Sequence, residues 1–193
     1  MTLPRIAKNT VTFVDEYCEA YKNIFPEVRS FEYFKYLHLG MISNVKRKSL
    51  PEIAKVVGLE NAQGLHHFLE NSPWDVNEFK RVRLDLLSKG LAGESFILVI
   101  DETGDKKKGK KTDYVDRQYI GNLGKVEQGI VSVNAYGILG DITFPLLFKV
   151  YKPRKRLKAG DTYKTKIELA RELITELREI GLNFDLVLAL KDL

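Results

Sequence analysis

The sequence predicts an α+β protein in which a helical N-terminal part, residues 1–92, precedes a mixed β-sheet in residues 93–193. Two observations support this class. Apolar residues recur every three to four positions through the first ninety residues, as in amphipathic helices. After Gly90 and Gly93 the period becomes that of strands, beginning with the apolar run at 96–100. This change of period predicts a domain boundary between residues 92 and 93.

Five helices are expected in the first part. Ser49 and Glu52 have the spacing of a capping box at the start of the third helix, and Gly58 ends that helix. Ser72, which precedes a proline, is expected to cap the fifth helix, and Gly90 to end it. The first two helices are indicated by apolar stripes at Val11, Val14, Cys18, Tyr21 and Phe25, ended by Pro26, and at Phe31, Phe34, Leu37 and Met41.

The short third and fourth helices, at 49–57 and 62–70, are joined by a glycine turn and resemble a helix-turn-helix. In that interpretation the second helix enters a groove of DNA, and Gln63, His66 and His67 lie near bases or phosphates. The alternative is an ordinary helix pair in a helical bundle, because glycine turns between short helices are common. The residues alone leave both interpretations open.

Four strands and one long helix are expected in the second part. Gly140 and Asp141 give the signal of a hairpin turn, and Pro145 has to lie at a sheet edge, a strand start or a bulge. Thr165 and Glu168 form a second capping box, at the start of the helix. The expected strands cover residues 96–101, 129–139, 142–151 and 184–190.

The order strand, strand, strand, helix, strand fits a partial ribonuclease-H-like sheet. Its first three strands form an antiparallel meander, and a right-handed crossover through the helix returns the fourth strand parallel to the first. Residues 101 and 190 would then lie side by side at the ends of neighbouring strands. The sequence thus predicts where a second functional residue should be found.

Composition limits the classes of function. One cysteine, Cys18, excludes an internal disulfide, and the absence of a Cys/His cluster argues against a zinc site. No apolar run approaches the length of a membrane span, so the chain reads as a cytoplasmic protein. The net charge of +5 permits an anionic partner. The basic residues form clusters at 46–48, 106–111 and 152–158, each of which could also be an ordinary solvated turn.

Asp101 is the candidate catalytic residue. It follows an apolar strand directly and precedes a lysine-rich loop, a layout suited to metal-dependent phosphodiester chemistry. We expect the strand to end at Asp101, with Thr103 and Gly104 in a tight turn. The plainer interpretation is an aspartate that caps this turn. A two-metal site needs several carboxylates, and one aspartate would hold Mg²⁺ or Mn²⁺ weakly.

The same loop has a competing interpretation as a nucleotide-binding P-loop. Residues 104–110 match the pattern G-x-x-x-x-G-K after a strand. The next residue should be Ser or Thr to bind Mg²⁺, and it is Lys111. No helical pattern follows, and residues 112–116 lead into another loop. The P-loop interpretation is therefore rejected.

Four segments carry a family resemblance: SLPEIAKVVGL at 49–59, HHFLENSPWD at 66–75, the stretch from VIDETGD to VNAYG at 99–137, and TFPLLFKVYKPRKRLKAGD at 143–161. They resemble bacterial insertion-sequence transposases of the DDE superfamily. The resemblance implies a helical DNA-binding-type head, a ribonuclease-H-like endonuclease core, Mg²⁺ or Mn²⁺ as cofactor, and double-stranded DNA at transposon ends as partner. The DNA contacts it suggests, together with the basic clusters, are Lys46, Arg47, Lys48, Gln63, His66, Lys106, Lys107, Lys108, Lys110, Lys111, Arg117, Arg154, Lys155 and Arg156.

The catalytic acids of the family map onto this chain incompletely. The V-I-D-E-T-G motif makes Asp101 the first acid and metal ligand. The second acid follows L-V-L-A, and here that position holds Leu190; the family's glutamate lies further downstream. Asp192, the nearest other acid, lies about 6–7 Å further along the strand.

From this mapping we expect a C-terminally truncated, nucleoid-associated transposase copy that lacks catalysis, binds DNA and can self-associate. The alternatives are a non-catalytic DNA-binding or inhibitory module, and a non-functional remnant.

Overall fold

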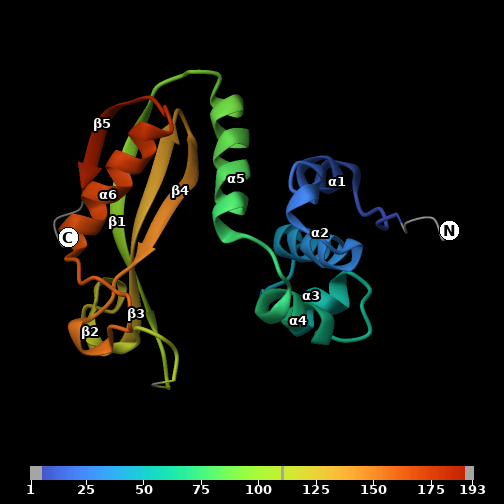
Figure 1. Cartoon of the computed structure of the whole chain (residues 1–193), viewed down its shortest axis with the longest axis horizontal. Coiled ribbons are helices and arrows are strands. Elements are labelled where there is room, and N and C mark those ends of the chain that lie inside the picture. Colours follow the sequence, from blue (N-terminus) through green and yellow to red (C-terminus); the bar gives the residue numbers. More distant parts are fainter. Residues whose placement is uncertain (1–5, 110, 190–193) are drawn as a thin grey trace. The chain divides into compact units, whose positions relative to one another are not determined.

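The computed structural model describes residues 6–109 and 111–189 and has the predicted α+β class (Figure 1). Leu190 and Lys110, for which we made predictions above, lie outside the described residues. The contacts within the chain form two compact units, Met1–Leu86 and Leu87–Leu193, and the division falls inside helix α5. We refer to them as the helical unit and the sheet unit.

The helical unit has two apolar centres. The larger joins α1, α2, α4 and α5 around Tyr21, Phe34 and Phe68, with Trp74 and Phe79 packed against it. The smaller joins α3 and α4 to α2 through Ile53 and Leu65. The elements are α1 (Thr12–Glu19), the 3-10 helix η1 (Lys22–Ile24), α2 (Val28–Ile42), α3 (Leu50–Val56), α4 (Gln63–Asn71) and α5 (Val76–Leu91).

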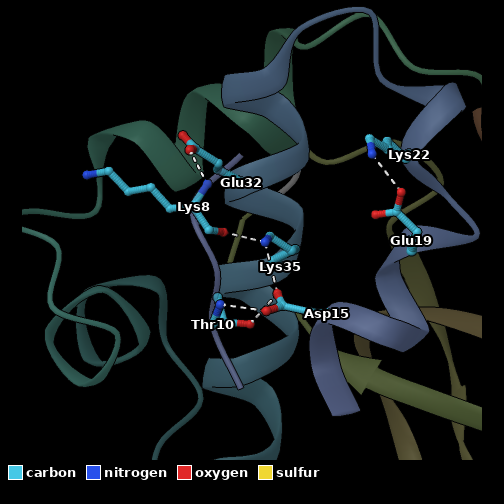
Figure 2. Close-up of polar contacts among 7 residues, drawn as sticks. All are labelled: Lys8, Thr10, Asp15, Glu19, Lys22, Glu32 and Lys35. Carbon is cyan, nitrogen blue, oxygen red and sulfur yellow. Dashed lines mark hydrogen bonds and ion pairs between the residues drawn. The ribbon is translucent and has the colours of Figure 1, made fainter. Parts of the chain in front are cut away.

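A buried charge network ties the start of the described chain to α2 (Figure 2). The Lys35 ammonium, whose side chain is 4% exposed, lies 2.9 Å from the Asp15 carboxylate and donates to the backbone carbonyl of Lys8. The same carboxylate accepts from the backbone N–H and the hydroxyl of Thr10. The buried Glu32 accepts from the backbone N–H of Lys8. Each buried charge in this network therefore has a partner.

The sheet unit has the predicted topology. β1 pairs with β3 antiparallel and with β5 parallel, and β4 pairs with β3 antiparallel. The strand order is β2-β3-β1-β5, with β4 beside β3. The elements are β1 (Phe96–Lys106), β2 (Asp116–Ile120), η2 (Gly121–Leu123), β3 (Lys125–Leu139), β4 (Ile142–Val150), η3 (Arg154–Arg156), α6 (Lys166–Glu179) and β5 (Phe184–Ala189).

Helix α6 covers one face of this sheet, as Figure 1 shows in orange. Leu173 and Leu177 of α6 are fully buried, as are Leu98 and Ile100 on β1. The predicted capping box is present at the start of α6: the Thr165 hydroxyl accepts from the backbone N–H of Glu168, and the Glu168 carboxylate accepts from that of Thr165. Pro145 lies at a shift in the β3–β4 register, as its missing N–H requires.

The structure corrects the predicted end of the first strand. β1 does not end at Asp101 but continues to Lys106, because β3 pairs with it residue by residue as far as Lys106–Gly129. Thr103 and Gly104 therefore lie within the strand and not in a turn. Gly104 is needed for a different reason: a Cβ there would lie 2.6 Å from the Ile120 side chain of β2. Strand β2 itself was not predicted.

One predicted capping box and one predicted helix start are wrong, although α3 does begin directly after Ser49 as predicted. Ser49 precedes α3, but its side chain makes no capping hydrogen bond, so the predicted box with Glu52 is absent. Ser72 does not cap α5, which starts four residues later. The Asp75 carboxylate accepts from the backbone N–H groups of Asn77 and Glu78 instead.

Candidate functional site

Asp101 lies in the middle of β1, directly opposite Asn134 of β3. Its Oδ1 accepts a hydrogen bond of 2.7 Å from the backbone N–H of Glu102. The neighbouring Ile100 is fully buried, whereas Asp101 is half-buried. Since successive residues of a strand point to opposite faces, the Asp101 carboxylate belongs to the face away from α6.

Glu102 faces α6 and has a different role from Asp101. Its carboxylate, 6% exposed, forms an ion pair with the ammonium of Lys166, the first residue of α6. The Lys166 ammonium also lies 5.8 Å from the centre of the Tyr151 ring. A buried carboxylate requires such a partner. The two adjacent acids thus have different roles. Glu102 forms an ion pair between β1 and α6, whereas Asp101 lies on the opposite, half-buried face of the strand.

The parallel β1–β5 ladder approaches the predicted second-acid position. Its last described pair joins Ile100 to Ala189. The predicted parallel placement of the fourth strand beside the first is therefore confirmed. Residue 190 itself lies outside the described residues, so the juxtaposition of Leu190 with Asp101 stays a prediction.

The described residues fit only part of a metal site. Asp101 offers a carboxylate oxygen, which is the donor that Mg²⁺ and Mn²⁺ prefer. Within residues 6–109 and 111–189, however, no three acidic, histidine or cysteine side chains come together as metal ligands. A pair of metal ions needs several carboxylates. The described part of the chain does not by itself fit a two-metal site, so no catalytic step through a metal is derived from it.

Basic residues gather at the end of the sheet beyond Asp101. β1 leads from Asp101 to Lys106 and the lysine loop. β4 leads to Tyr151, whose backbone N–H donates to Val131, the residue opposite Gly104. The segment 152–158 therefore leaves the sheet three ladder positions past Asp101, which is about 10 Å along the strand. Two basic segments distant in sequence thus share one end of the sheet.

Several of the predicted DNA contacts are engaged in ion pairs. Lys106 lies 3.3 Å from Glu127, and Lys107 pairs with Asp105. Hydrogen bonds from Lys125 and Lys106 lower the pKa of the Glu127 carboxyl. Arg117 on β2 is exposed, and Lys108 and Lys111 are exposed on the loop before it. The lysine cluster is therefore only partly available to an anion.

In the helical unit, α3 and α4 form the predicted helix pair, and Gly58 adopts the left-handed φ of 75° that the turn requires. Leu65 and Phe68 of α4 are buried, while Gln63, His66 and His67 are exposed. The other predicted contacts of this unit, Lys46, Arg47 and Lys48, are exposed in the segment before α3. The geometry is compatible with groove binding and equally with a bundle.

Three residues that make ion pairs or hydrogen bonds near the candidate site of the sheet unit were not identified from the sequence: Lys166, Tyr114 and Asp161. Tyr114 has a left-handed φ of 59°, which is unusual for a non-glycine residue. Its hydroxyl lies 3.3 Å from the Asp161 carboxylate. The partners in the Tyr114–Asp161 and Lys166–Glu102 pairs lie more than forty residues apart in the sequence, so no local spacing could have revealed these contacts.

Comparison with known proteins agrees with this geometry. The family described as "DDE superfamily endonuclease" matches residues 24–189, so the chain belongs to that family. The chain is 64% identical over 189 residues to a protein of Microchaete diplosiphon named "Probable transposase for insertion sequence element IS701". The match covers 98% of this chain and 50% of the relative, so the chain spans about half the length of the curated relative. No solved structure matches.

None of the helices in the described part of the chain combines the length and the apolar composition that a membrane span requires.

Proposed function

We propose that the chain is part of an insertion-sequence transposase that moves DNA by metal-dependent strand cleavage and transfer. The observation that carries this proposal is the position of Asp101. In a chain of the DDE endonuclease family, the acid of the V-I-D-E-T-G motif lies on the central strand, beside a parallel strand that leads to the second-acid position. The similarity to the IS701 transposase supports the same function.

In this proposal, residues 93–193 contribute the first acid, and residues 1–92 act as a DNA-binding head. Asp101 would hold one ligand position of a Mg²⁺ or Mn²⁺ ion. When bound with its remaining ligands, the metal would activate the attacking water and stabilise the leaving oxygen. Asp101 is oriented by the backbone N–H of Glu102, and the Glu102–Lys166 pair fixes that stretch of β1 against α6.

The 193 residues alone are expected to bind DNA without cleaving it. The exposed cations of the lysine loop, Arg154, Lys155 and segment 46–48 supply the contacts with phosphates. The described residues provide a single acid at the site, and Leu190 stands where the family has the second. We also expect self-association, since Phe148, Leu186 and Leu188 on the sheet are about half exposed.

Binding can be tested by titrating double-stranded DNA at increasing salt. Neutralisation of about 4–6 phosphates gives a log-log slope of roughly −4 to −5. Transposon-end DNA and unrelated duplex of equal length should be compared. A chain that binds neither duplex at low salt would disprove the DNA-binding part of the proposal.

Cleavage can be tested by nicking of end-bearing DNA with Mg²⁺ or Mn²⁺, using Asp101→Asn as the control. We expect no nicking by either protein. Metal-dependent nicking that the Asp101→Asn change abolishes would show that the missing ligands come from residues beyond those described or from a second copy.

A further inference from the structure

Asp161 joins two basic segments that lie about forty residues apart in the sequence. Its Oδ1 lies 2.5 Å from the Lys152 ammonium and accepts from the Tyr114 hydroxyl at 3.3 Å. Its Oδ2 accepts from the backbone N–H of Lys158 at 2.8 Å. The Asp161 side chain is only 10% exposed. Asp161 therefore contacts the loop before β2 through Tyr114 and holds Lys152 and Lys158 of its own segment in place.

Further contacts join the same two segments, 112–114 and 152–161, and we call this set of contacts the junction. The Lys158 ammonium lies 2.5 Å from the Asp113 carboxylate, and the Arg156 guanidinium donates to the carbonyl of Thr112. The Lys152 ammonium lies 4.9 Å from the centre of the Tyr114 ring. Tyr114 holds a left-handed backbone conformation, which persists only where the surroundings fix it. Four contacts thus dock the two segments, and one of them is made by Asp161.

The junction divides the local cations into two groups. Lys152 and Lys158 neutralise Asp161 and Asp113 and so belong to the scaffold. Lys111, Arg154 and Lys155 are exposed, and in the described part of the chain no carboxylate forms an ion pair with them. The Arg154 guanidinium instead lies 4.1 Å from the centre of the Tyr163 ring, and its hydrogen bond to Tyr163 helps to lower the pKa of that phenol. Its remaining donors are left for a ligand.

We propose that Asp161 organises Lys111, Arg154 and Lys155 into one preformed surface for the sugar-phosphate backbone of DNA. This inference rests on the proposed DNA binding and deepens it. Exposed cations without acidic partners in the described part of the chain suit a polyanion, and backbone phosphates are the groups that Arg and Lys contact most in DNA. The surface adjoins the end of the sheet beyond Asp101, so bound DNA would run past the catalytic acid.

The discriminating variant is Asp161→Asn. It removes one negative charge from a DNA-binding surface, so a simple electrostatic patch predicts tighter binding. If Asp161 organises the surface, binding instead weakens about tenfold at low salt, and the salt slope becomes less negative by about 2, because Lys111 and Lys155 no longer act together. Asp141→Asn is the matched control, since Asp141 is exposed in the β3–β4 turn and changes the charge equally. It should bind as tightly as wild type or slightly more tightly.

Substitution of two lysines of the segment 152–158 tests the distinction between scaffold cations and DNA-contacting cations. Lys155→Ala should reduce the salt slope by about 1, as expected for one lost phosphate contact. Lys158→Ala should leave the slope unchanged, because Lys158 is already paired with Asp113. Equal effects of the two changes would overturn the assignment of Lys158 to the scaffold.

A measurement without DNA separates this inference from the proposed function. Amide hydrogen exchange in residues 111–115 should quicken in Asp161→Asn and stay unchanged in Asp141→Asn. Unchanged exchange in Asp161→Asn would refute the organising role whatever the DNA result. If wild type binds DNA and Asp161→Asn binds equally or more tightly, the organising role fails while the DNA-binding proposal stands. A wild-type chain that binds no duplex refutes both the surface and the proposed binding.

Discussion

The helical unit and the sheet unit each contain a lysine–aspartate ion pair, and the two pairs differ in burial. In the helical unit the Lys35 side chain is 4% exposed and Asp15 is 25% exposed. In the sheet unit Lys152 is 37% exposed and Asp161 10%. The buried pair lies in a packed helical core, whereas the other lies at the edge of a surface. We therefore expect the Lys35–Asp15 ion pair to stabilise the helical unit and the Lys152–Asp161 ion pair to hold the proposed DNA-binding surface in place.

The two carboxyls also titrate low for different reasons. Desolvation of Asp15 opposes its ionisation, but hydrogen bonds from Lys35 and Thr10 outweigh it and lower its pKa. The pKa of Asp161 is lowered first by the hydrogen bond from Lys152 and then by the backbone N–H of Lys158. The cation that partners Asp15 is almost fully buried, whereas the cation that partners Asp161 is partly exposed, so loss of the Lys35 charge should be more damaging. Four measurements test this comparison.

The largest effect is expected from Lys35→Met. The change leaves Asp15 and the Lys8 carbonyl in the core without their cation, and the free energy of unfolding should fall by about 3 kcal/mol. The single tryptophan, Trp74, belongs to the helical unit and reports its denaturation. Lys22→Met is the control, because the Lys22–Glu19 pair in Figure 2 is more than half exposed on both sides. Equal losses in the two variants would contradict the importance of burial.

The next largest effect is expected on the stability of the helical unit at acidic pH. Because the folded-state pKa of Asp15 is lowered below its unfolded value of about 3.9, the ionised carboxylate contributes full stability above roughly pH 4. That contribution is lost as the pH falls through the folded-state pKa. The Trp74 transition of wild type should therefore weaken below pH 4 more steeply than that of Asp15→Asn. Parallel pH profiles would contradict the ionised network.

A smaller effect separates the two predicted capping boxes. Thr165→Ala removes an observed cap of α6 and should lower the free energy of unfolding of the sheet unit by about 1 kcal/mol. Ser49→Ala should have almost no effect, because the Ser49 side chain makes no capping hydrogen bond. Circular dichroism melts of both variants provide the test. A larger loss from Ser49→Ala would show that the Ser49 side chain caps α3 after all.

The smallest effect is expected from Lys152→Met. This pair is partly exposed, so solvent screens it, and the melting temperature should change less than in Thr165→Ala. DNA binding should nevertheless weaken, because Asp161 loses the cation that orients it. A large loss of stability with unchanged DNA binding would reverse the comparison between the two pairs.

The class of fold and the central strand could be predicted from the amino-acid sequence. The change of apolar period placed helices before the sheet, and the strand order fixed a parallel fourth strand beside the first. These features are local or follow from chain connectivity, as does the capping box of Thr165. The motif around Asp101 and the family resemblance were equally readable, and the family match supports them.

The length of β1 and the pairing of the charged side chains could not be predicted from the sequence. The strand runs past Asp101 because β3 supplies hydrogen-bonding partners as far as Gly129. A glycine is needed at position 104 because the Ile120 side chain packs directly against its backbone. The pairs Lys35–Asp15, Lys166–Glu102 and the Asp161 junction join residues twenty or more positions apart or arise in irregular loops. Such contacts depend on how separate elements pack together, and no local pattern of residues encodes that packing.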